Sequence, residues 1–244
     1  MTTLNELNLQ YTNLGLSEAL TRLRAQFDGR IVFSTSLGLE DQAITDAIFR
    51  NDLAIEVFTL DTGRNFPETY ATLDETRRKY GKSITAYYPQ TEAIQTYVNN
   101  NGINAMYDSL ALRKECCHIR KIEPLKRALK GAQIWITGLR AAQSSYRAAN
   151  MNLFEDDASF GLLKFNPILS WSGEKLWAYI HQYEVPYNAL HEQGFPSIGC
   201  APCTRAIAAG EDERAGRWWW EQNSGAQECG LHFKDGKPER RKVA

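Results

Sequence analysis

The chain has 244 residues, of which 43% are hydrophobic and 23% are charged, and this balance indicates a globular protein rather than a disordered or fibrous one. Because 28 Lys and Arg are balanced by 29 Asp and Glu, the net charge is only -1, and no overall positive field exists to hold nucleic acid or an anionic membrane. No window approaches the roughly 18 apolar residues of a bilayer span, and no leader pattern is visible at the N-terminus. We therefore expect a cytoplasmic protein that binds any anionic ligand through a local group of cations.

Short apolar segments alternate with longer ones of mixed polarity along the first 140 residues. Runs of β-branched and aromatic residues predict buried parallel strands at residues 31–33, 55–60, 84–88 and 134–136. The intervening segments predict helices at residues 41–50, 67–80, 91–98 and 115–129, with Pro67 in a first turn and with Gly81 and Gly131 as C-terminal caps. This alternation predicts an α/β fold built on a doubly wound, mostly parallel sheet.

The pattern becomes less regular after Gly138. One further helix is predicted to begin near Ser172, and the chain from Gly194 onward is rich in glycine, proline, cysteine and charge. We expect one α/β domain over residues 1–210 and an irregular C-terminal extension, a flexible tail, over residues 211–244.

Small and polar residues follow the first predicted strand. In an open parallel sheet, ligands bind beyond the carboxyl ends of the strands, where small residues let backbone amides and a helix N-terminus approach an anion. The loop has neither a Walker A motif nor G-x-G-x-x-G, and it would also suit an ordinary helix N-cap. Its candidate phosphate-binding residues are Ser34, Thr35, Ser36 and Gly38.

Two further loops are expected at the same edge of the sheet. The second strand ends in Leu60, Asp61, Thr62 and Gly63, and the fourth is followed by Arg140 and Arg147. Arginine suits phosphate or sulfate because its planar fork donates two hydrogen bonds and stays charged. Ordinary surface ion pairs are the alternative interpretation of these arginines.

Four of the five cysteines form two close pairs, Cys116 with Cys117 and Cys200 with Cys203. This arrangement is unlike the even spread of a secreted disulfide framework. Four thiolates favour an iron–sulfur cluster or zinc, and zinc usually takes two C-x-x-C pairs rather than a tandem pair. A redox pair at Cys200 and Cys203, or four inert core thiols, are the other interpretations. We expect the tandem pair to open a helix on which Lys121 shares a face with Cys117.

The fifth cysteine, Cys229, lies in the polar tail beside a glycine and close to His232. A cysteine in such a segment suits a reactive group better than a core residue, although an incidental thiol and an uninvolved histidine are the simpler interpretations. Arg214 and Arg217 lie upstream and could meet an anion if the tail folds back. Residues 218–220, three tryptophans, are either an anchor for the tail or a platform for a partner.

Taken in order, these segments resemble the assimilatory adenylyl-sulfate (APS) reductases, relatives of the phosphoadenylyl-sulfate (PAPS) reductases, from about residue 31 to residue 233. The resemblance implies an adenine-nucleotide α-hydrolase-like fold with a modified PP-loop, and a [4Fe-4S] cluster on the four paired cysteines. Leu37 departs from the phenylalanine that is frequent in the first loop of that family. The resemblance rests on residues 34–41, 60–63, 116–124, 138–147, 200–203 and 228–232.

The resemblance also implies an activity, the thiol-dependent reduction of APS to sulfite and AMP in sulfate assimilation and cysteine biosynthesis. Cys229 would attack the sulfur of APS to form an S-sulfocysteine, assisted by His232, and thioredoxin or glutaredoxin would release sulfite. The paired cysteines favour APS over PAPS. Substrate binding falls to Ser34, Thr35, Ser36, Gly38, Leu60, Asp61, Thr62, Gly63, Lys121, Arg140, Arg147, Arg214 and Arg217. A PAPS reductase, a PP-loop ATP-pyrophosphatase and an iron–sulfur regulatory protein are the alternatives, and a homo-oligomer is left open.

Overall fold

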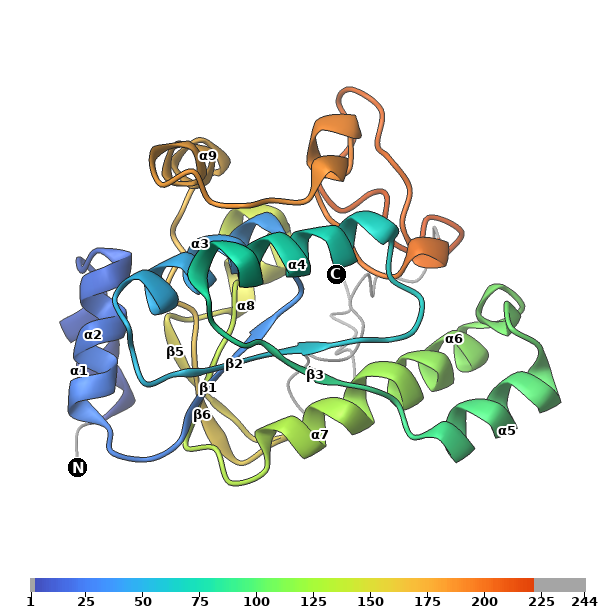
Figure 1. Ribbon diagram of the computed structural model, residues 1–244, viewed down its shortest axis with the longest axis horizontal. Coiled ribbons are helices and arrows are strands. Elements are labelled where there is room, and N and C mark those ends of the chain that lie inside the picture. Colours follow the sequence, from blue (N-terminus) through green and yellow to red (C-terminus); the bar gives the residue numbers. More distant parts are fainter. Residues whose placement is uncertain (1–2, 222–244) are drawn as a thin grey trace, which may run out of the picture.

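The computed structural model describes residues 3–221, and their strands form one six-stranded sheet in the order β3-β2-β1-β4-β6-β5 (Figure 1). The predicted strands are present as β1 (Ile31–Thr35), β2 (Glu56–Leu60), β3 (Thr85–Tyr87) and β4 (Ile134–Ile136). These four strands and β6 (Leu162–Phe165) run parallel, while β5 (Phe154–Asp157) is antiparallel to β6. The predicted α/β class with a mostly parallel sheet is confirmed.

Helices cover both faces of this sheet, as the alternation of side chains along the strands requires. Ile31 and Phe33 belong to a core cluster that includes side chains of α2, α3 and α9, whereas Val32 packs on the opposite face against Leu125 of α7. Figure 1 shows α3 and α4 on one side of the sheet and α5, α6 and α7 on the other. The helices are α1 (Leu4–Tyr11), α2 (Leu16–Gln26), α3 (Leu39–Arg50), α4 (Pro67–Tyr80), α5 (Thr91–Asn101), α6 (Leu110–Cys117), α7 (Glu123–Leu129), α8 (Ser145–Asn150) and α9 (Gly173–Gln182).

The helix that carries the tandem cysteines differs from its prediction. It begins at Leu110, where the Ser109 hydroxyl caps the amide of Leu112, so Cys116 and Cys117 end α6 instead of opening a helix. A π-helical turn, His118–Ile122, then joins α6 to α7. Pro124 has no N–H to donate to the carbonyl four residues back, and a regular α-helical ladder therefore cannot pass through it.

The region after β4 holds more structure than the sequence predicts. The hairpin of β5 and β6 turns through Gly161, whose φ of 65° is in the left-handed region. Each strand has only four residues and places a charged side chain in the interior, where Lys164 pairs with Glu155 at 2.8 Å. This charge interrupts the apolar pattern by which buried strands are identified.

Beyond α9 the described chain is irregular, as expected. It contains 3-10 turns at Ala189–Gln193 and Ala201–Cys203, and Thr204 forms an isolated antiparallel bridge with Arg217. None of the helices in residues 3–221 combines the length and apolar character that crossing a bilayer requires. Cys229 and His232 lie outside the described residues, so the division at residue 210 and the flexible tail stay predictions.

Candidate functional site

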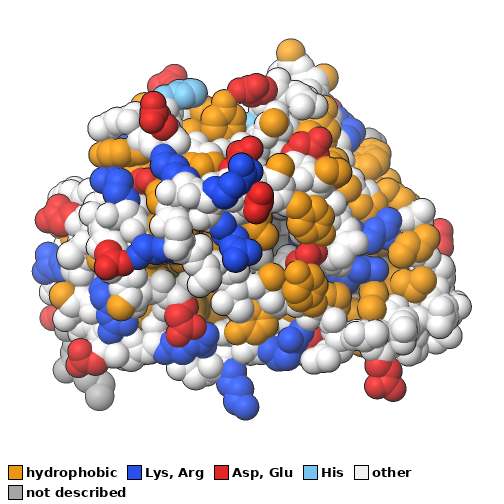
Figure 2. Space-filling view, viewed as in Figure 1, with side chains coloured by type: hydrophobic (Ala, Val, Ile, Leu, Met, Phe, Trp, Pro, Cys, Tyr) orange, Lys and Arg blue, Asp and Glu red, His pale blue; other side chains and the backbone are white. Residues whose placement is uncertain are grey.

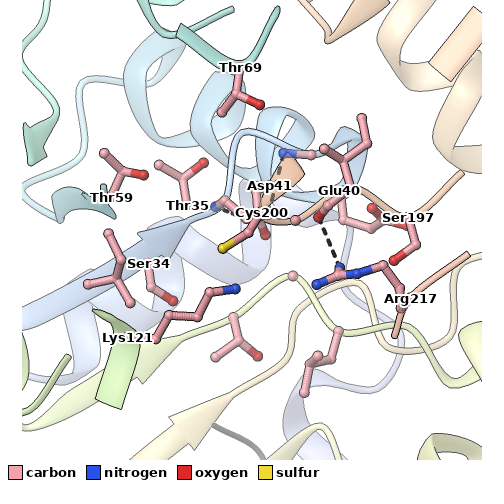
Figure 3. Close-up of a pocket in the computed structure, with 18 of the residues that line it drawn as sticks. Ser34, Thr35, Glu40, Asp41, Thr59, Thr69, Lys121, Ser197, Cys200 and Arg217 are labelled. Atoms are coloured by element: carbon pink, nitrogen blue, oxygen red, sulfur yellow. Dashed lines mark hydrogen bonds between the residues drawn. The ribbon is translucent and has the colours of Figure 1, made fainter. Parts of the chain in front are cut away.

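A cavity of about 200 Å³ lies at the carboxyl ends of β1, β2 and β4 (Figure 3). Its lining comes from the three predicted loops, from the π-helical turn, from α8 and from the C-terminal region. The structure therefore brings together residues that are up to 184 positions apart in the sequence, Ser34 and Trp218. The predicted substrate-binding residues on its lining are Ser34, Thr35, Ser36, Gly38, Leu60, Thr62, Lys121, Arg147, Arg214 and Arg217.

The first loop is held by Asp41 and does not cap α3. The carboxylate of Asp41 accepts hydrogen bonds from the backbone amide and the hydroxyl of Ser36, both at 2.6 Å. Leu37 adopts a left-handed φ of 62°, and its amide donates to the hydroxyl of Thr35. Gly38 is the N-cap of α3 without any side-chain cap. The helix N-terminus therefore reaches the cavity uncapped by a side chain, as an anion site requires.

Asp61 shapes the second loop from outside the cavity lining. Its carboxylate accepts the amide of Gly63 at 2.8 Å and the phenol of Tyr70 at 2.9 Å. Burial, followed by the hydrogen bond and the charge of Asp61, raises the pKa of Tyr70 to about 12. Gly63 has a φ of 68°, which a residue with a side chain rarely adopts. In the described chain, Asp61 and Gly63 thus position Thr62 and do not line the cavity.

Arg140 also lies behind the cavity wall. Its buried guanidinium donates from Nε to Glu40 at 2.8 Å and from Nη2 to Glu213 at 2.9 Å. Glu40 lines the cavity, and Glu213 directly precedes Arg214. Arg140 therefore connects the start of α3 to the C-terminal region, because it forms buried ion pairs with residues of two segments that line the cavity.

Four other cations do line the cavity, and they come from separate elements. Lys121 lies on the π-helical turn, Arg147 on α8, and Arg214 and Arg217 in the C-terminal region. The Nη1 atom of Arg217 donates to the carbonyl of Ile198 at 3.1 Å, which fixes the guanidinium beside the loop that precedes Cys200. On the face seen in Figure 2, exposed Lys and Arg side chains are interspersed with acidic ones, whereas Arg147, Arg214 and Arg217 of the cavity are buried. This supply of positive charge exists although the chain as a whole is nearly neutral.

A second, smaller cavity collects the four paired cysteines, as predicted. It is lined by Cys116, Cys117, Cys200 and Cys203 together with Met106, Pro202 and the cations Arg64, Arg113, Arg120 and Lys121. Lys121 lines both cavities, and its side chain points toward that of Cys200 in Figure 3. The predicted proximity of this lysine to the cysteine pairs is therefore present, and it links the two cavities.

The donors around the smaller cavity fit an anionic group. Arg120 lines it with a buried Nε that finds no acceptor among the described residues. Within residues 3–221, no group of three or more His, Cys, Asp or Glu side chains is arranged to hold a metal ion. The four thiols that line this cavity are soft donors of the kind that hold zinc or an iron–sulfur cluster.

The thiols of this cavity differ in acidity. Burial raises the pKa of the Cys203 thiol to about 12, and the neighbouring Cys200 and Cys117 add to the effect. Burial would also raise the pKa of Cys200, but Lys121, the Thr62 hydroxyl and Arg217 outweigh it and bring the pKa below its ordinary value. The more acidic of these two thiols is thus the one nearest the cations of the larger cavity.

Sequence reasoning missed several lining residues. Thr59 lies near the end of β2 and Thr137 directly after β4, positions that the rule for carboxyl ends of parallel strands could have identified. Thr69 from α4 and His191 from a 3-10 turn carry no such signal, because they reach the cavity only through tertiary packing.

The chain is similar to known proteins over most of its length. A family profile described as the phosphoadenosine phosphosulfate reductase domain matches residues 30–206. An adenosine 5'-phosphosulfate reductase of Allochromatium vinosum is 52% identical over 221 residues, covering 91% of this chain and 85% of the relative. One of Burkholderia cepacia is 47% identical over 219 residues, covering 88% and 87%.

Solved structures show the same fold. A phosphoadenylyl-sulfate reductase from Candida auris, crystallised as a phosphate complex, aligns with a TM-score of 0.69 at 26% identity, covering 81% of this chain and 93% of that chain. An FMN adenylyltransferase from Candida glabrata aligns with a TM-score of 0.53 at 15% identity over 98% of this chain and 78% of that chain, a likeness of fold alone.

Proposed function

Because the chain belongs to the phosphoadenosine phosphosulfate reductase domain family, we propose that it reduces APS to sulfite and AMP with electrons from a thiol, in sulfate assimilation. The observation that carries this proposal is the cavity at the sheet edge, which combines an uncapped helix N-terminus with four cations and shares Lys121 with four converging cysteines. Relatives about half identical to this chain over most of its length are named for the same reaction.

The nucleotide binds across the carboxyl ends of the strands. The first loop and the N-terminus of α3 take an anionic group, and the second loop, with Leu60 and Thr62, takes the nucleoside. Lys121, Arg147, Arg214 and Arg217 surround the phosphosulfate. Cations at this place offset the repulsion between an anionic substrate and an attacking thiolate.

Cys229 supplies that thiolate. Its sulfur attacks the sulfur of APS, a new S–S bond forms, and the S–O bond to the phosphate breaks with its electron pair leaving on AMP. The product on the enzyme is an S-sulfocysteine, and His232 stabilises the thiolate before the attack. A thiolate of a protein reductant, thioredoxin or glutaredoxin, then attacks the Cys229 sulfur and sulfite leaves with the S–S electron pair. The second thiol of the reductant resolves the mixed disulfide, so that two thiols supply the two electrons.

Cys116, Cys117, Cys200 and Cys203 would hold a [4Fe-4S] cluster. When bound, the cluster supplies a compact anionic centre, whose charge Lys121, Arg113 and Arg120 offset. Lys121 then lies between this centre and the substrate anion, and its ammonium is held at the boundary of the two cavities. We place the reaction in the cytoplasm, where thiol reductants are kept reduced.

Sulfite release by the purified protein tests the function. Given thioredoxin and either APS or PAPS, the protein should release sulfite with a higher kcat/KM for APS. A preference for PAPS would assign the chain to the PAPS reductases instead. Sulfite release from neither nucleotide would contradict the proposal, and pyrophosphate release from ATP in the same preparation would favour an ATP-pyrophosphatase.

A further inference from the structure

Arg113 joins the cysteine cavity to Glu221, the last residue that the structure describes. Its Nε and Nη2 atoms donate to the two carboxylate oxygens of Glu221, each at 2.8 Å, and the two side chains are only 2% and 9% exposed. The same guanidinium hydrogen-bonds Cys117, one turn along α6, and lies 5.1 Å from the ring centroid of Trp218. One buried cation therefore contacts a predicted cluster ligand and the start of the C-terminal segment.

The geometry of this pair is more specific than stability requires. A buried ion pair gains little over well-packed apolar side chains, since desolvation of both charges offsets their attraction. A bidentate arginine–carboxylate contact does, however, fix both the distance and the orientation of its partners. The pair is thus well suited to setting the direction in which the chain leaves Glu221.

That direction matters because the chain continues from Glu221 toward Cys229. Cys229 is eight residues beyond Glu221, and eight extended residues span at most about 29 Å. Trp218, three residues before Glu221, lines the nucleotide cavity and packs against Cys203 of the cysteine cavity. The segment that carries Cys229 consequently starts from the wall that separates the two cavities.

We propose that Arg113 and Glu221 are a positioning pair, which orients the start of the C-terminal segment so that Cys229 meets the sulfur of bound substrate. This inference rests on the proposed function. Nucleotide binding does not require the pair, because neither side chain lines the nucleotide cavity within the described chain. The attack of Cys229 requires it.

If the pair of Arg113 and Glu221 only tethered the chain, its loss would slow the attack of Cys229 far less than if the pair orients the chain. If Glu221 is released, the next held residue is Trp220, whose ring packs against the cluster of Met106, Cys203 and Trp218 and lies 4.6 Å from the ring of Tyr107, centroid to centroid. The free chain before Cys229 then grows from eight to nine residues, which lowers its effective concentration by less than about twofold. Loss of orientation costs far more in reactions between held groups, so we expect a fall of more than about tenfold in the rate of attack.

The test is a single turnover without reductant. Anaerobic wild-type protein, Glu221→Gln and Glu221→Asp are mixed with APS, and the sulfocysteine adduct on Cys229 is followed by quenching and intact-mass spectrometry with peptide mapping. Asp46→Asn, which breaks the ion pair of the buried Asp46 carboxylate with Arg50, is the matched control, because neither side chain lines either cavity. Iron content and the Kd for AMP are measured on the same preparations.

We expect Glu221→Gln to form the adduct more than about tenfold more slowly than wild type, with Glu221→Asp intermediate, and with AMP affinity and iron content within about twofold of wild type. The control should react at the wild-type rate. An unchanged rate in Glu221→Gln, a parallel loss of iron or AMP affinity, or an equal slowing of the control would overturn the inference while wild type still forms the adduct. Absence of the adduct in wild type would instead overturn the proposed function and the inference with it.

Discussion

The hydroxyl of Thr62 lies 3.3 Å from the sulfur of Cys200, in hydrogen-bond contact across 138 residues of sequence. Thr62 belongs to the loop after β2 that lines the nucleotide cavity, and Cys200 belongs to the cysteine cavity. Nearby, Nη1 of Arg120 donates to the carbonyl of Thr62 at 2.5 Å. Hydrogen bonds therefore connect residues of the two cavities, and we expect a substitution in one cavity to alter the geometry of the other.

The four converging thiols predict the metal content. Anaerobically purified protein should be yellow-brown with about four irons per chain. Replacing Cys200 and Cys203 together by serine should remove both iron and colour, because a hydroxyl is a poor ligand for a soft metal centre. The measurements are iron analysis and visible absorption. Zinc in place of iron, or colour that survives the double replacement, would contradict the cluster.

Cys229 is expected to carry the covalent intermediate. Replacing it by serine should abolish sulfite formation, because a hydroxyl is a far weaker nucleophile at neutral pH, while AMP affinity and iron content stay close to wild type. In wild-type protein given APS without reductant, intact-mass spectrometry should find a sulfo adduct of about 80 Da on Cys229. An adduct mapped to Cys200 or Cys203, or normal turnover by Cys229→Ser, would argue against this role.

Asp41 predicts a pH dependence of stability. Burial raises its pKa from 3.8 to about 6, against the effect of two hydrogen bonds from Ser36. Because the folded-state pKa lies above the unfolded one, the folded protein binds the proton more tightly. The stabilisation from this proton is complete below about pH 4 and is lost as the pH rises through 6. At neutral pH the buried charge therefore costs about 3 kcal/mol.

Asp41→Asn tests this dependence, since an amide keeps an acceptor for Ser36 without the charge. Above pH 7 its free energy of unfolding in urea should exceed that of wild type by about 1–3 kcal/mol, and the difference should shrink toward pH 4. Asp74→Asn, at an exposed position on α4, is the control and should show no such trend. If the difference in free energy of unfolding between Asp41→Asn and wild type did not change with pH, the raised pKa of the Asp41 carboxyl would be contradicted.

Gly138 is expected to tolerate no side chain. A Cβ at this position would lie 2.0 Å from Oδ1 of Asp41 and 3.2 Å from Cβ of Glu40, so Asp41 would have to move away and release Ser36. Gly138→Ala should therefore lower the free energy of unfolding by about 1–3 kcal/mol and weaken AMP binding. Gly173→Ala is the matched control, because a Cβ there meets nothing within 4 Å. Urea unfolding and AMP titration compare the two, and equal effects would refute the clash.

The repetitive part of the fold follows from local patterns. β1, β2 and β4 are buried parallel strands of the kind that continuous apolar runs predict, and Gly81 caps α4 with a left-handed φ of 62° as its position suggests. α1 is not predicted from periodicity, yet Thr3 and Glu6 form a capping box that is visible as a sequence pattern. The hairpin of β5 and β6 is hidden by the buried pair of Lys164 and Glu155, whose mutual compensation no local pattern contains.

The sequence likewise predicts those residues of the site whose positions depend on local patterns. Strand ends locate Ser34, Leu60 and Thr62, since topology alone brings them to one edge. The sequence does not reveal which arginine faces the cavity, because Arg140 is turned away by its pairing with Glu40 and Glu213, and those partners become neighbours only when the chain is folded.

The π-helical turn has a consequence for insertions and deletions. The amide of Glu123 donates to the carbonyl of His118, five residues back, so the turn holds one residue more than an α-helix would need. Removing a single residue from it would bring the turn to α-helical spacing, apart from the hydrogen bond that Pro124 cannot donate. Each residue of an α-helix turns the chain by about 100°, and the deletion would therefore rotate the side chains of α7 by about that angle relative to those of α6. The surplus residue thus sets how α7, whose Leu125 lines the nucleotide cavity, is rotated relative to the tandem cysteines at the end of α6.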